Sequence, residues 1–347
     1  MRIEKPEGEL RRGWTTGACA AAATKAALTA LLTGKFPDPV SITLPKGETP
    51  SFVLSLEGTG EGWAQAGIIK DAGDDPDVTH GCTVVATVRL RGQGVTFKAG
   101  AGVGMVTKAG LPVAVGEPAI NPMPREMMRK VAHELGASDV EIEISIPDGE
   151  AIAQKTWNPR LGIIGGLSIL GTTGIVHPFS CAAWIASIHR GVDVARAMGL
   201  THIAGCTGST SEDAVRAHYG LSLEAMVDMG DFAGGLLKYV RDHPVARVTI
   251  GGGFGKITKL AQGAMDLHSG RSQVDFEWLA DFSPEGIRDA VKGANTAQQA
   301  LEMLGPDLAA RVAQEAKSQV MRVLRGSEIA SDIIIVDRGG KIIAYAR

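Results

Sequence analysis

The chain has 347 residues, more than one hydrophobic core usually organises, so two domains are expected. Hydrophobic residues make up 44% and charged residues 21%, with a mean hydropathy of +0.08, which excludes wholesale disorder. The net charge of −3 and the pI of about 6.3 provide no basic footprint for nucleic acid or an acidic membrane.

The cysteines and the N-terminus indicate a cytoplasmic protein. Cys19, Cys82, Cys181 and Cys206 form no Cys-x-x-Cys pair, so neither a zinc knuckle nor a disulfide framework is expected. The start, MRIEKPEGELRRGW, lacks the apolar core of a signal peptide, and no run approaches the roughly 18 apolar residues of a membrane span.

The first part of the chain predicts an α+β domain with a mostly antiparallel sheet. A helix is expected from Thr15-Thr16-Gly17 to Gly34, because hydroxyl residues precede strong helix formers and glycine follows them. A further helix is expected over 122–135 and a strand over 139–146, and we place the end of this domain at residue 150. Short β-branched runs predict further strands, starting at Val40, Ser51, Ala64, Cys82 and Val95.

From residue 151 to 347 the pattern changes to strand, glycine-rich turn and helix, repeated three times. This order predicts a parallel sheet flanked by helices, a Rossmann-like three-layer domain with a ligand crevice at the carboxyl ends of its strands. The three turns cover 171–174, 205–209 and 251–255. Amphipathic helices are expected beyond Asp281, and Arg338-Gly339-Gly340 predicts a closing β-hairpin.

Two helix starts follow from capping signals in this domain. His177 is expected at the N-cap of a helix that begins at Pro178 and ends before Gly191. Ser209 and Glu212 have the spacing of a capping box.

The glycine-rich segment TIGGGFGKIT excludes two nucleotide-binding motifs. A P-loop is absent because Lys256 is followed by isoleucine, and a dinucleotide fingerprint from Gly251 would need glycine at position 256. The remaining pattern of Gly251, Gly253 and Gly255 lets the backbone approach an adenosyl group or a carboxylate, which would suit S-adenosylmethionine. A structural glycine-rich turn explains the same pattern.

The segment DAGDDPDVTHG concentrates Asp71, Asp74, Asp75, Asp77 and His80. It lacks the glycine and the final glutamate of an EF-hand, which excludes a calcium loop of that form. Surface Asx-type turns explain such a cluster, and so does a loop that accepts a proton or hydrogen-bonds a ring N–H.

The eight histidines show no pair at metal-ligand spacing, so no protein-bound metal is expected. His177 and His268 stand in polar turns, where a histidine either satisfies a local backbone group or serves as acid or base. No Gly-x-Ser-x-Gly elbow is present, which argues against an α/β-hydrolase.

An ordered set of strings carries a family resemblance: GWTTGACAAAATKAA, KDAGDDPDVTHG, GEPAINPMPREMM, NPRLGIIGGLSILGTTGIVHPFS, GCTGSTSE and TIGGGFGKITKLAQGAMDLHSGRS. Together they resemble the cobalt-precorrin-5B (C1)-methyltransferase family, CbiD, of anaerobic-type cobalamin biosynthesis. The resemblance runs from about Gly13 to Arg271 and is looser beyond.

The resemblance implies methyl transfer from S-adenosylmethionine to carbon 1 of a cobalt-bearing corrin precursor, giving cobalt-precorrin-6A, with cobalt present only as part of the substrate. Such a transfer needs reactants held in attack geometry more than a triad or a protein metal. A carbon nucleophile gains strength if a proton leaves the macrocycle, which calls for a base. Helix N-termini and cationic side chains suit the many carboxylates of a tetrapyrrole.

These implications give three sets of expected site residues, with the glycine-rich turns of the second domain holding the donor and polar loops of the first domain covering the tetrapyrrole. The candidate bases are Asp75, Asp77, His177 and His268; the donor-binding residues are Thr172, Thr173, Gly174, Gly208, Ser209, Gly251, Gly252, Gly253 and Gly255; and the substrate-binding residues are Thr15, Thr16, Gly17, Lys70, Arg125, Arg160, Lys256 and Arg271.

Two other classes of function compete with methyl transfer: a nucleotide-dependent phosphoryl-transfer enzyme and a noncatalytic tetrapyrrole-binding protein. The failed P-loop spacing speaks against the first. The expected partner is a small-molecule tetrapyrrole, without nucleic acid or membrane, and a homo-oligomer is compatible with the sequence.

Overall fold

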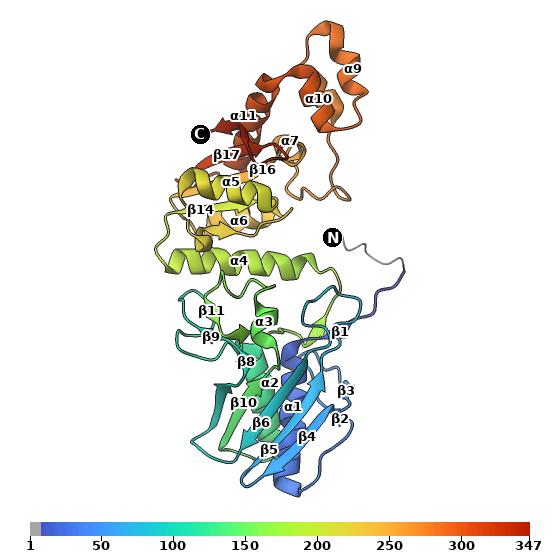
Figure 1. Cartoon of the computed structure of the whole chain (residues 1–347), viewed down its shortest axis with the longest axis vertical. Helices are drawn as coiled ribbons and strands as arrows, with labels where there is room; N and C mark the ends of the chain where they lie inside the picture. The colour runs from blue at the N-terminus through green and yellow to red at the C-terminus, as the bar shows by residue number, and fades with distance from the viewer. Residues whose placement is uncertain (1–7) are drawn as a thin grey trace. The chain divides into compact units, whose positions relative to one another are not determined.

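The computed structural model describes residues 8–347 and divides the chain into two compact units, Met1–Ser180 and Cys181–Arg347 (Figure 1). Part of the N-terminal segment on which the absence of a signal peptide was judged, residues 1–7, lies outside the described residues. Among residues 8–347, none of the helices combines the length and the apolar character that crossing a membrane requires.

A five-stranded sheet with helices on one face forms the first unit (Figure 1). Every neighbouring pair in this sheet is antiparallel except β10–β7, which is parallel. The strands, in sheet order, are β4 (Leu56–Gly60), β5 (Trp63–Ile69), β6 (Thr83–Arg89), β10 (Val140–Ser145) and β7 (Val95–Ala99). Helix α1 (Thr16–Thr33) packs on β5 and β6, and α2 (Pro122–Glu134) packs on α1 and β7.

Alanines make the close packing of α1 on the sheet possible. The helix buries an almost continuous alanine run, and Ala64 and Ala66 of β5 face the same core. The expected capping is confirmed, since Thr15 accepts a hydrogen bond from the Ala18 N–H and Gly34 ends the helix in the left-handed conformation.

Four short strand pairs complete the first unit. They are β1 (Gly13–Trp14) with β13 (Ile175–Val176), β2 (Val40–Ser41) with β3 (Ser51–Phe52), β8 (Gly102–Val103) with β12 (Gly166–Leu167), and β9 (Met105–Val106) with β11 (Ile163–Ile164); helix α3 spans Gly149–Ala153. The pairing corrects the domain boundary expected at residue 150, because β11, β12 and β13 take partners from residues before 107. The division follows Ser180, and the turn at 171–174 belongs to the first unit.

A second five-stranded sheet forms the centre of the other unit. It runs β15 (Met226–Val227), β14 (His202–Cys206), β16 (Arg247–Gly253), β17 (Ala330–Val336) and β18 (Ile342–Ala346), parallel except for β18. The expected closing hairpin, β17–β18, is confirmed.

Helices cover both faces of this sheet. One buried cluster joins alternate strand residues to α4 (Cys181–Ala197), α6 (Ala233–Asp242), α7 (Phe254–Ala261) and α11 (Pro306–Val323), and a smaller one joins the opposite residues to α5 (Ser209–Tyr219). The remaining short helices are η1 (Leu223–Ala225), α8 (Phe276–Ala280), η2 (Glu285–Ile287), α9 (Arg288–Lys292) and α10 (Ala297–Leu304).

Helix α4 differs from its expected bounds at both ends. It begins at Cys181, so His177 is not its N-cap; Phe179 adopts a φ of 56°, which a helix cannot continue through. Gly191 lies inside the helix and does not end it.

Two other local predictions are also wrong. Gly208, with extended backbone, is the N-cap of α5 and Ser209 is its first residue, so the Ser209–Glu212 capping box does not form. Gly251–Gly253 continue β16 in register with β17 instead of forming a turn, because α7 starts directly at Phe254.

Candidate functional site

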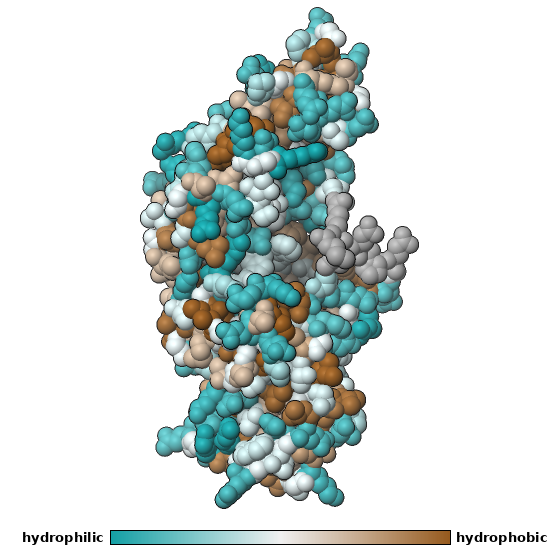
Figure 2. Space-filling view, in the orientation of Figure 1, coloured by the Kyte–Doolittle hydropathy of each residue, from teal (hydrophilic) through white to brown (hydrophobic). Residues whose placement is uncertain are grey.

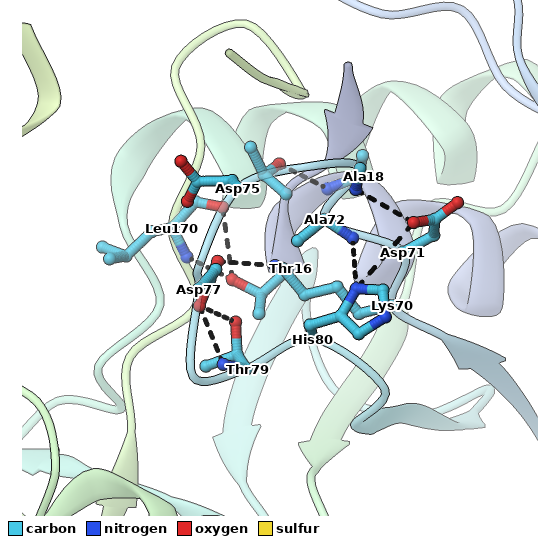
Figure 3. A network of polar contacts seen from close by, with 12 residues as sticks. Thr16, Ala18, Lys70, Asp71, Ala72, Asp75, Asp77, Thr79, His80 and Leu170 are labelled. Atoms are coloured by element: carbon cyan, nitrogen blue, oxygen red, sulfur yellow. Dashed lines mark hydrogen bonds and ion pairs between the residues drawn. The ribbon is translucent and has the colours of Figure 1, made fainter. Parts of the chain in front are cut away.

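The acidic loop that follows β5 is a fixed polar network in the first unit (Figure 3). Its start is tied to the preceding segment: the Arg11 N–H donates to Asp74 at 2.6 Å, and the Arg11 guanidinium pairs with Asp71. The hydrogen bonds from Arg11, together with the Gly73 N–H, lower the pKa of Asp71 to about 2. His80 Nδ1 accepts from the Ala72 N–H at 3.1 Å, which fixes the imidazole across the loop.

Lys70 and Asp77 form a buried ion pair beneath this loop. The Lys70 side chain is only 2% exposed, and its Nζ lies 2.6 Å from Asp77 Oδ2. The other oxygen of Asp77 accepts from the N–H and the hydroxyl of Thr79. Burial raises the pKa of Asp77, but the Lys70 charge and these hydrogen bonds outweigh it and hold that pKa below its ordinary value. The ammonium group of Lys70, which was expected to bind substrate, is therefore already paired with Asp77.

Asp75 is the carboxylate of this loop whose pKa is raised. Burial raises its pKa above the ordinary aspartate value, although a hydrogen bond from Phe179 opposes the shift. Its Oδ1 accepts from the Phe179 N–H at 2.8 Å, which holds the loop against the left-handed residue near the end of the first unit. Among the three candidate bases of this unit, Asp75 has the environment that suits proton acceptance best.

The start of α1 and the turn at 170–174 are joined directly. Thr16 Oγ1 accepts from the Leu170 N–H at 2.9 Å, and the Gly17 N–H donates to the Leu170 carbonyl at 2.8 Å. A Cβ on Gly171, whose φ is 135°, would lie 2.2 Å from Thr15 Oγ1, so only glycine fits. The structure thus brings Thr15–Gly17, expected to bind substrate, beside Thr172–Gly174, expected to bind the donor.

The other expected residues of the first unit have varied surroundings. Arg125 is engaged with the backbone, since its Nε donates to the Ile120 carbonyl at 2.7 Å and its other nitrogens reach Pro118 and Glu117. Arg160 is half-buried in the segment between α3 and β11, and His177 is exposed between β13 and α4.

In the second unit, the carboxyl ends of β14 and β16 form an open, glycine-lined edge. A Cβ on Gly208 or on Gly253 would meet no heavy atom within 4 Å, so the backbone there is accessible. Gly208 and Gly253 are the N-caps of α5 and α7, and neither supplies a side-chain cap. The first N–H groups of two helices therefore start at neighbouring strands, an arrangement that favours an anionic group.

Charged side chains border this edge. Lys256 Nζ lies 2.7 Å from Asp231 Oδ1 and donates to the Thr207 carbonyl at 3.1 Å, which links α7 to the loops after β15 and β14. Lys259, one turn later, is buried and donates to the Leu267 carbonyl at 3.0 Å; burial lowers its pKa.

The segment 266–272 folds beside the same loops. The Arg271 guanidinium pairs with Asp266 and lies 5.4 Å over the Phe232 ring. His268 is exposed, and its Nδ1 accepts from the Gly270 N–H at 3.1 Å. Lys256 and Arg271, expected to bind substrate, thus lie in the same unit as Gly208, Ser209 and Gly251–Gly255, whereas Thr172–Gly174 do not.

Sequence reasoning missed one exposed aromatic side chain near these loops, Trp184. It is 44% exposed, and its indole N–H donates to the Asp228 carbonyl at 3.1 Å. A tryptophan within a helical alanine-rich segment gives no signal of exposure in the sequence. Within residues 8–347, three or more His, Cys, Asp or Glu side chains nowhere gather so as to hold a metal ion.

Comparisons with known proteins identify the family. The family model CbiD matches residues 3–178, and the model "CbiD, C-terminal domain" matches residues 266–347, where the resemblance had been looser. A protein of Brucella anthropi named cobalt-precorrin-5B C(1)-methyltransferase is 60% identical over 97% of this chain and 96% of its own length. A protein of Brucella abortus with the same name is also 60% identical, over 98% of this chain and 97% of its own.

One solved structure is similar as well. The cobalamin biosynthesis protein (cbiD) of Archaeoglobus fulgidus shares 30% sequence identity and covers 78% of this chain and 86% of its own, with a TM-score of 0.40. The two family models together span most of the chain, and the relatives align over nearly all of it. This chain belongs to the CbiD family.

Proposed function

We propose that this protein transfers a methyl group from S-adenosylmethionine to carbon 1 of cobalt-precorrin-5B, giving cobalt-precorrin-6A. The observation that carries the proposal is the 60% identity to proteins named for this reaction over nearly the full length of both chains. The donor supplies an activated methyl group on a sulfonium; the carbon–sulfur bond breaks as the bond to carbon 1 forms, and the macrocycle loses a proton.

The second unit offers the better place for the donor. The glycine-lined edge gives backbone room for an adenosyl group, and the starts of α5 and α7 suit the carboxylate of the amino-acid part. The parallel sheet between two helical layers supports the Rossmann-like assignment, since ligands of such sheets bind outside the carboxyl ends of the strands. The turn at 172–174, also expected to bind the donor, lies in the first unit.

We assign the proton acceptor to Asp75 and the surrounding polar loop to the tetrapyrrole. Asp77 is committed to Lys70 and Thr79, and His177 and His268 are exposed, whereas Asp75 combines burial with a raised pKa. A carboxylate whose proton affinity is increased is a stronger base toward a weakly acidic ring proton.

The direct test is a transfer assay. Purified protein is supplied with isotopically labelled S-adenosylmethionine and enzymatically prepared cobalt-precorrin-5B, and the product is weighed by mass spectrometry. We expect one labelled methyl group on the macrocycle. A product without label, in the presence of substrate bound to the protein, contradicts the proposal and favours a noncatalytic tetrapyrrole-binding protein.

Gly253→Val tests the donor site. The Gly253 backbone is extended, with φ −70° and ψ 156°, and a Cβ there meets open space, so the fold should tolerate valine. We expect at least a tenfold loss of S-adenosylmethionine affinity in calorimetry, with the protein still folded and the melting temperature lowered by no more than a few degrees, since valine is a poorer N-cap than glycine. Gly286→Val, equally open but on η2, is the matched control. Unchanged donor affinity in Gly253→Val would show that the donor binds elsewhere.

Asp75→Asn tests the base. The amide oxygen keeps an acceptor for the Phe179 N–H while the negative charge is lost. We expect the methylation rate to fall by about 10²-fold or more with S-adenosylmethionine affinity unchanged, since general bases typically contribute that much. A rate within twofold of the wild type excludes Asp75 as the base.

The phosphoryl-transfer alternative is not supported by the named relatives. It predicts that ATP raises the melting temperature, because a ligand that binds only the folded state stabilises it. If S-adenosylmethionine raises the melting temperature and ATP does not, this alternative is excluded.

A further inference from the structure

A partly exposed ion pair lies at the glycine-lined edge of the second unit's sheet. Lys256 Nζ lies 2.7 Å from Asp231 Oδ1, and the two side chains are 39% and 20% exposed. Figure 2 shows hydrophilic residues intermixed with hydrophobic ones on the face in view, so exposed charge alone does not mark a site. The measured contacts of this pair are what connect it to the edge.

Direct contacts place the lysine of this pair at the edge. Lys256 is the third residue of α7, whose N-cap is Gly253. Its Nζ donates to the Thr207 carbonyl at 3.1 Å, and Thr207 immediately precedes Gly208, the N-cap of α5. The Thr207 N–H in turn donates to the Gly251 carbonyl of β16 at 2.9 Å. The ammonium group is therefore held within hydrogen-bonding distance of the loop that joins β14 to the start of α5.

The aspartate of the pair is fixed through its own backbone. The Asp231 carbonyl accepts from the Leu267 N–H at 2.8 Å, and the Leu267 carbonyl accepts from buried Lys259 at 3.0 Å. Asp231 Oδ1 is buried and accepts no hydrogen bond from the described residues, because Lys256 approaches it without the direction that a hydrogen bond requires. The carboxylate therefore retains acceptor capacity for a further cationic donor.

A lysine–aspartate pair complements the charges of an amino acid. The methyl donor carries an α-carboxylate and an α-ammonium group on the same carbon. A fixed cation beside a fixed anion can face both of these groups, each with the opposite charge, and charge-assisted hydrogen bonds of this kind are the stronger ones. A lone lysine would instead select only for a carboxylate.

We propose that Lys256 binds the α-carboxylate of the methyl donor and that Asp231 binds its α-ammonium group. This inference rests on the proposed function; it gives Lys256 the donor in place of the tetrapyrrole and adds Asp231, which no motif indicates. A carboxylate at Lys256 also lies near the N-terminus of α7, where the helix dipole favours negative charge. The ion pair thus provides specificity for the amino-acid part of the donor, apart from the room that the glycines give its adenosyl part.

Calorimetry of the full chain with three ligands tests this pairing. S-Adenosylmethionine has both charged groups, decarboxylated S-adenosylmethionine keeps only the ammonium group, and 5′-methylthioadenosine lacks the amino-acid part. We expect the wild type to bind S-adenosylmethionine about tenfold or more tightly than the decarboxylated form, since a hydrogen bond to a charged group contributes about that much.

Each variant should weaken only the ligands that carry the group it contacts. Lys256→Met should lower the affinity for S-adenosylmethionine by about tenfold or more and should not lower that for the decarboxylated form. Asp231→Asn should weaken both of these ligands and leave the affinity for 5′-methylthioadenosine within about twofold. Lys292→Met, which removes the lysine of the 2.8 Å pair with Glu277 in the same unit, is the matched control and should change none of the three affinities.

The outcomes separate this assignment from the proposed function. A wild type that transfers methyl groups without preferring S-adenosylmethionine to its decarboxylated form overturns the assignment alone. Unchanged affinities in both variants, or an equal loss of all three ligands, overturn it as well, because an equal loss means that the pair only supports the loops. A wild type that binds none of the ligands and transfers no methyl group contradicts the proposed function. If one variant does not fold, the wild-type preference and the other variant still decide.

Discussion

Lys70 shows how one buried charge determines the behaviour of the acidic loop. With a side chain 2% exposed, its ammonium depends on Asp77 for compensation, because an isolated buried charge is strongly unfavourable. The loop therefore presents Asp75 from a framework whose other carboxylates already have partners: Asp71 and Asp74 contact Arg11, and Asp77 pairs with Lys70.

Asp77→Asn leaves the Lys70 ammonium without its counterion. We expect a loss of about 3 kcal/mol in the free energy of unfolding, measured by urea denaturation, because breaking a buried pair from one side exposes the full desolvation cost. The double variant Lys70→Met/Asp77→Asn should recover part of this loss. Lys130→Met, which breaks the exposed pair with Glu134, should cost no more than about 0.5 kcal/mol. Equal effects of the buried and exposed variants would refute this account.

Aspartates with lowered and with raised pKa values change the stability of the fold with pH in opposite directions. Asp71 and Asp77 have folded-state pKa values below their unfolded ones, so their contribution is present above pH about 4 and is lost as the pH falls through the folded-state pKa, which for Asp71 is about 2. Asp75 has a raised pKa, so its ionised form costs stability at neutral pH. We therefore expect Asp75→Asn to raise the melting temperature at pH 7 while it slows methylation. A lower melting temperature would show that the hydrogen bond to Phe179 outweighs the charge.

At the scale of secondary-structure elements, the N-terminus of α1 is hydrogen-bonded to the segment at Leu170 and is not an open anion-binding site. The N–H of Leu170 depends on Thr16 Oγ1 for its hydrogen bond, and Thr16 is 5% exposed. Thr16→Val should therefore cost about 1–3 kcal/mol, the usual penalty for an unsatisfied buried group, in denaturant unfolding. Thr33→Val, at the exposed end of the same helix, should change stability by less than about 0.5 kcal/mol. Similar losses at both positions would argue against the junction.

A helix or strand could be predicted from the sequence when the residues that determine its bounds lie close to it in the chain. The bounds of α1, α2 and β10 depend on capping and periodicity within a few residues, and they match closely. The segment 163–176 looks like a strand followed by a turn, but its partners lie more than fifty residues earlier, a dependence that local reasoning does not detect. Trp184 was missed for the same reason, because its indole contacts Asp228 and Gly230, which lie more than forty residues later.

The whole molecule contains two large hydrophobic cores, one in each unit. The large buried cluster of the first unit contains residues from Ala18 to Ile175, and that of the second contains residues from Ile188 to Ala346. We expect calorimetry of the full chain to resolve two unfolding transitions, of which S-adenosylhomocysteine raises one and Asp77→Asn lowers the other. A single transition moved by both would mean that the units unfold as one cooperative system.

The order of strands in the second sheet has a consequence for synthesis on the ribosome. Arg247 at the start of β16 pairs with Asp332 of β17, 85 positions later, and β17 lies between β16 and β18. While a nascent chain still lacks those positions, the long edge of β16 stays without its neighbour, and an uncovered apolar strand edge invites aggregation. Messages truncated within the last coding stretch should therefore yield insoluble product that depends on chaperones, even though every glycine of the glycine-lined edge has already been translated.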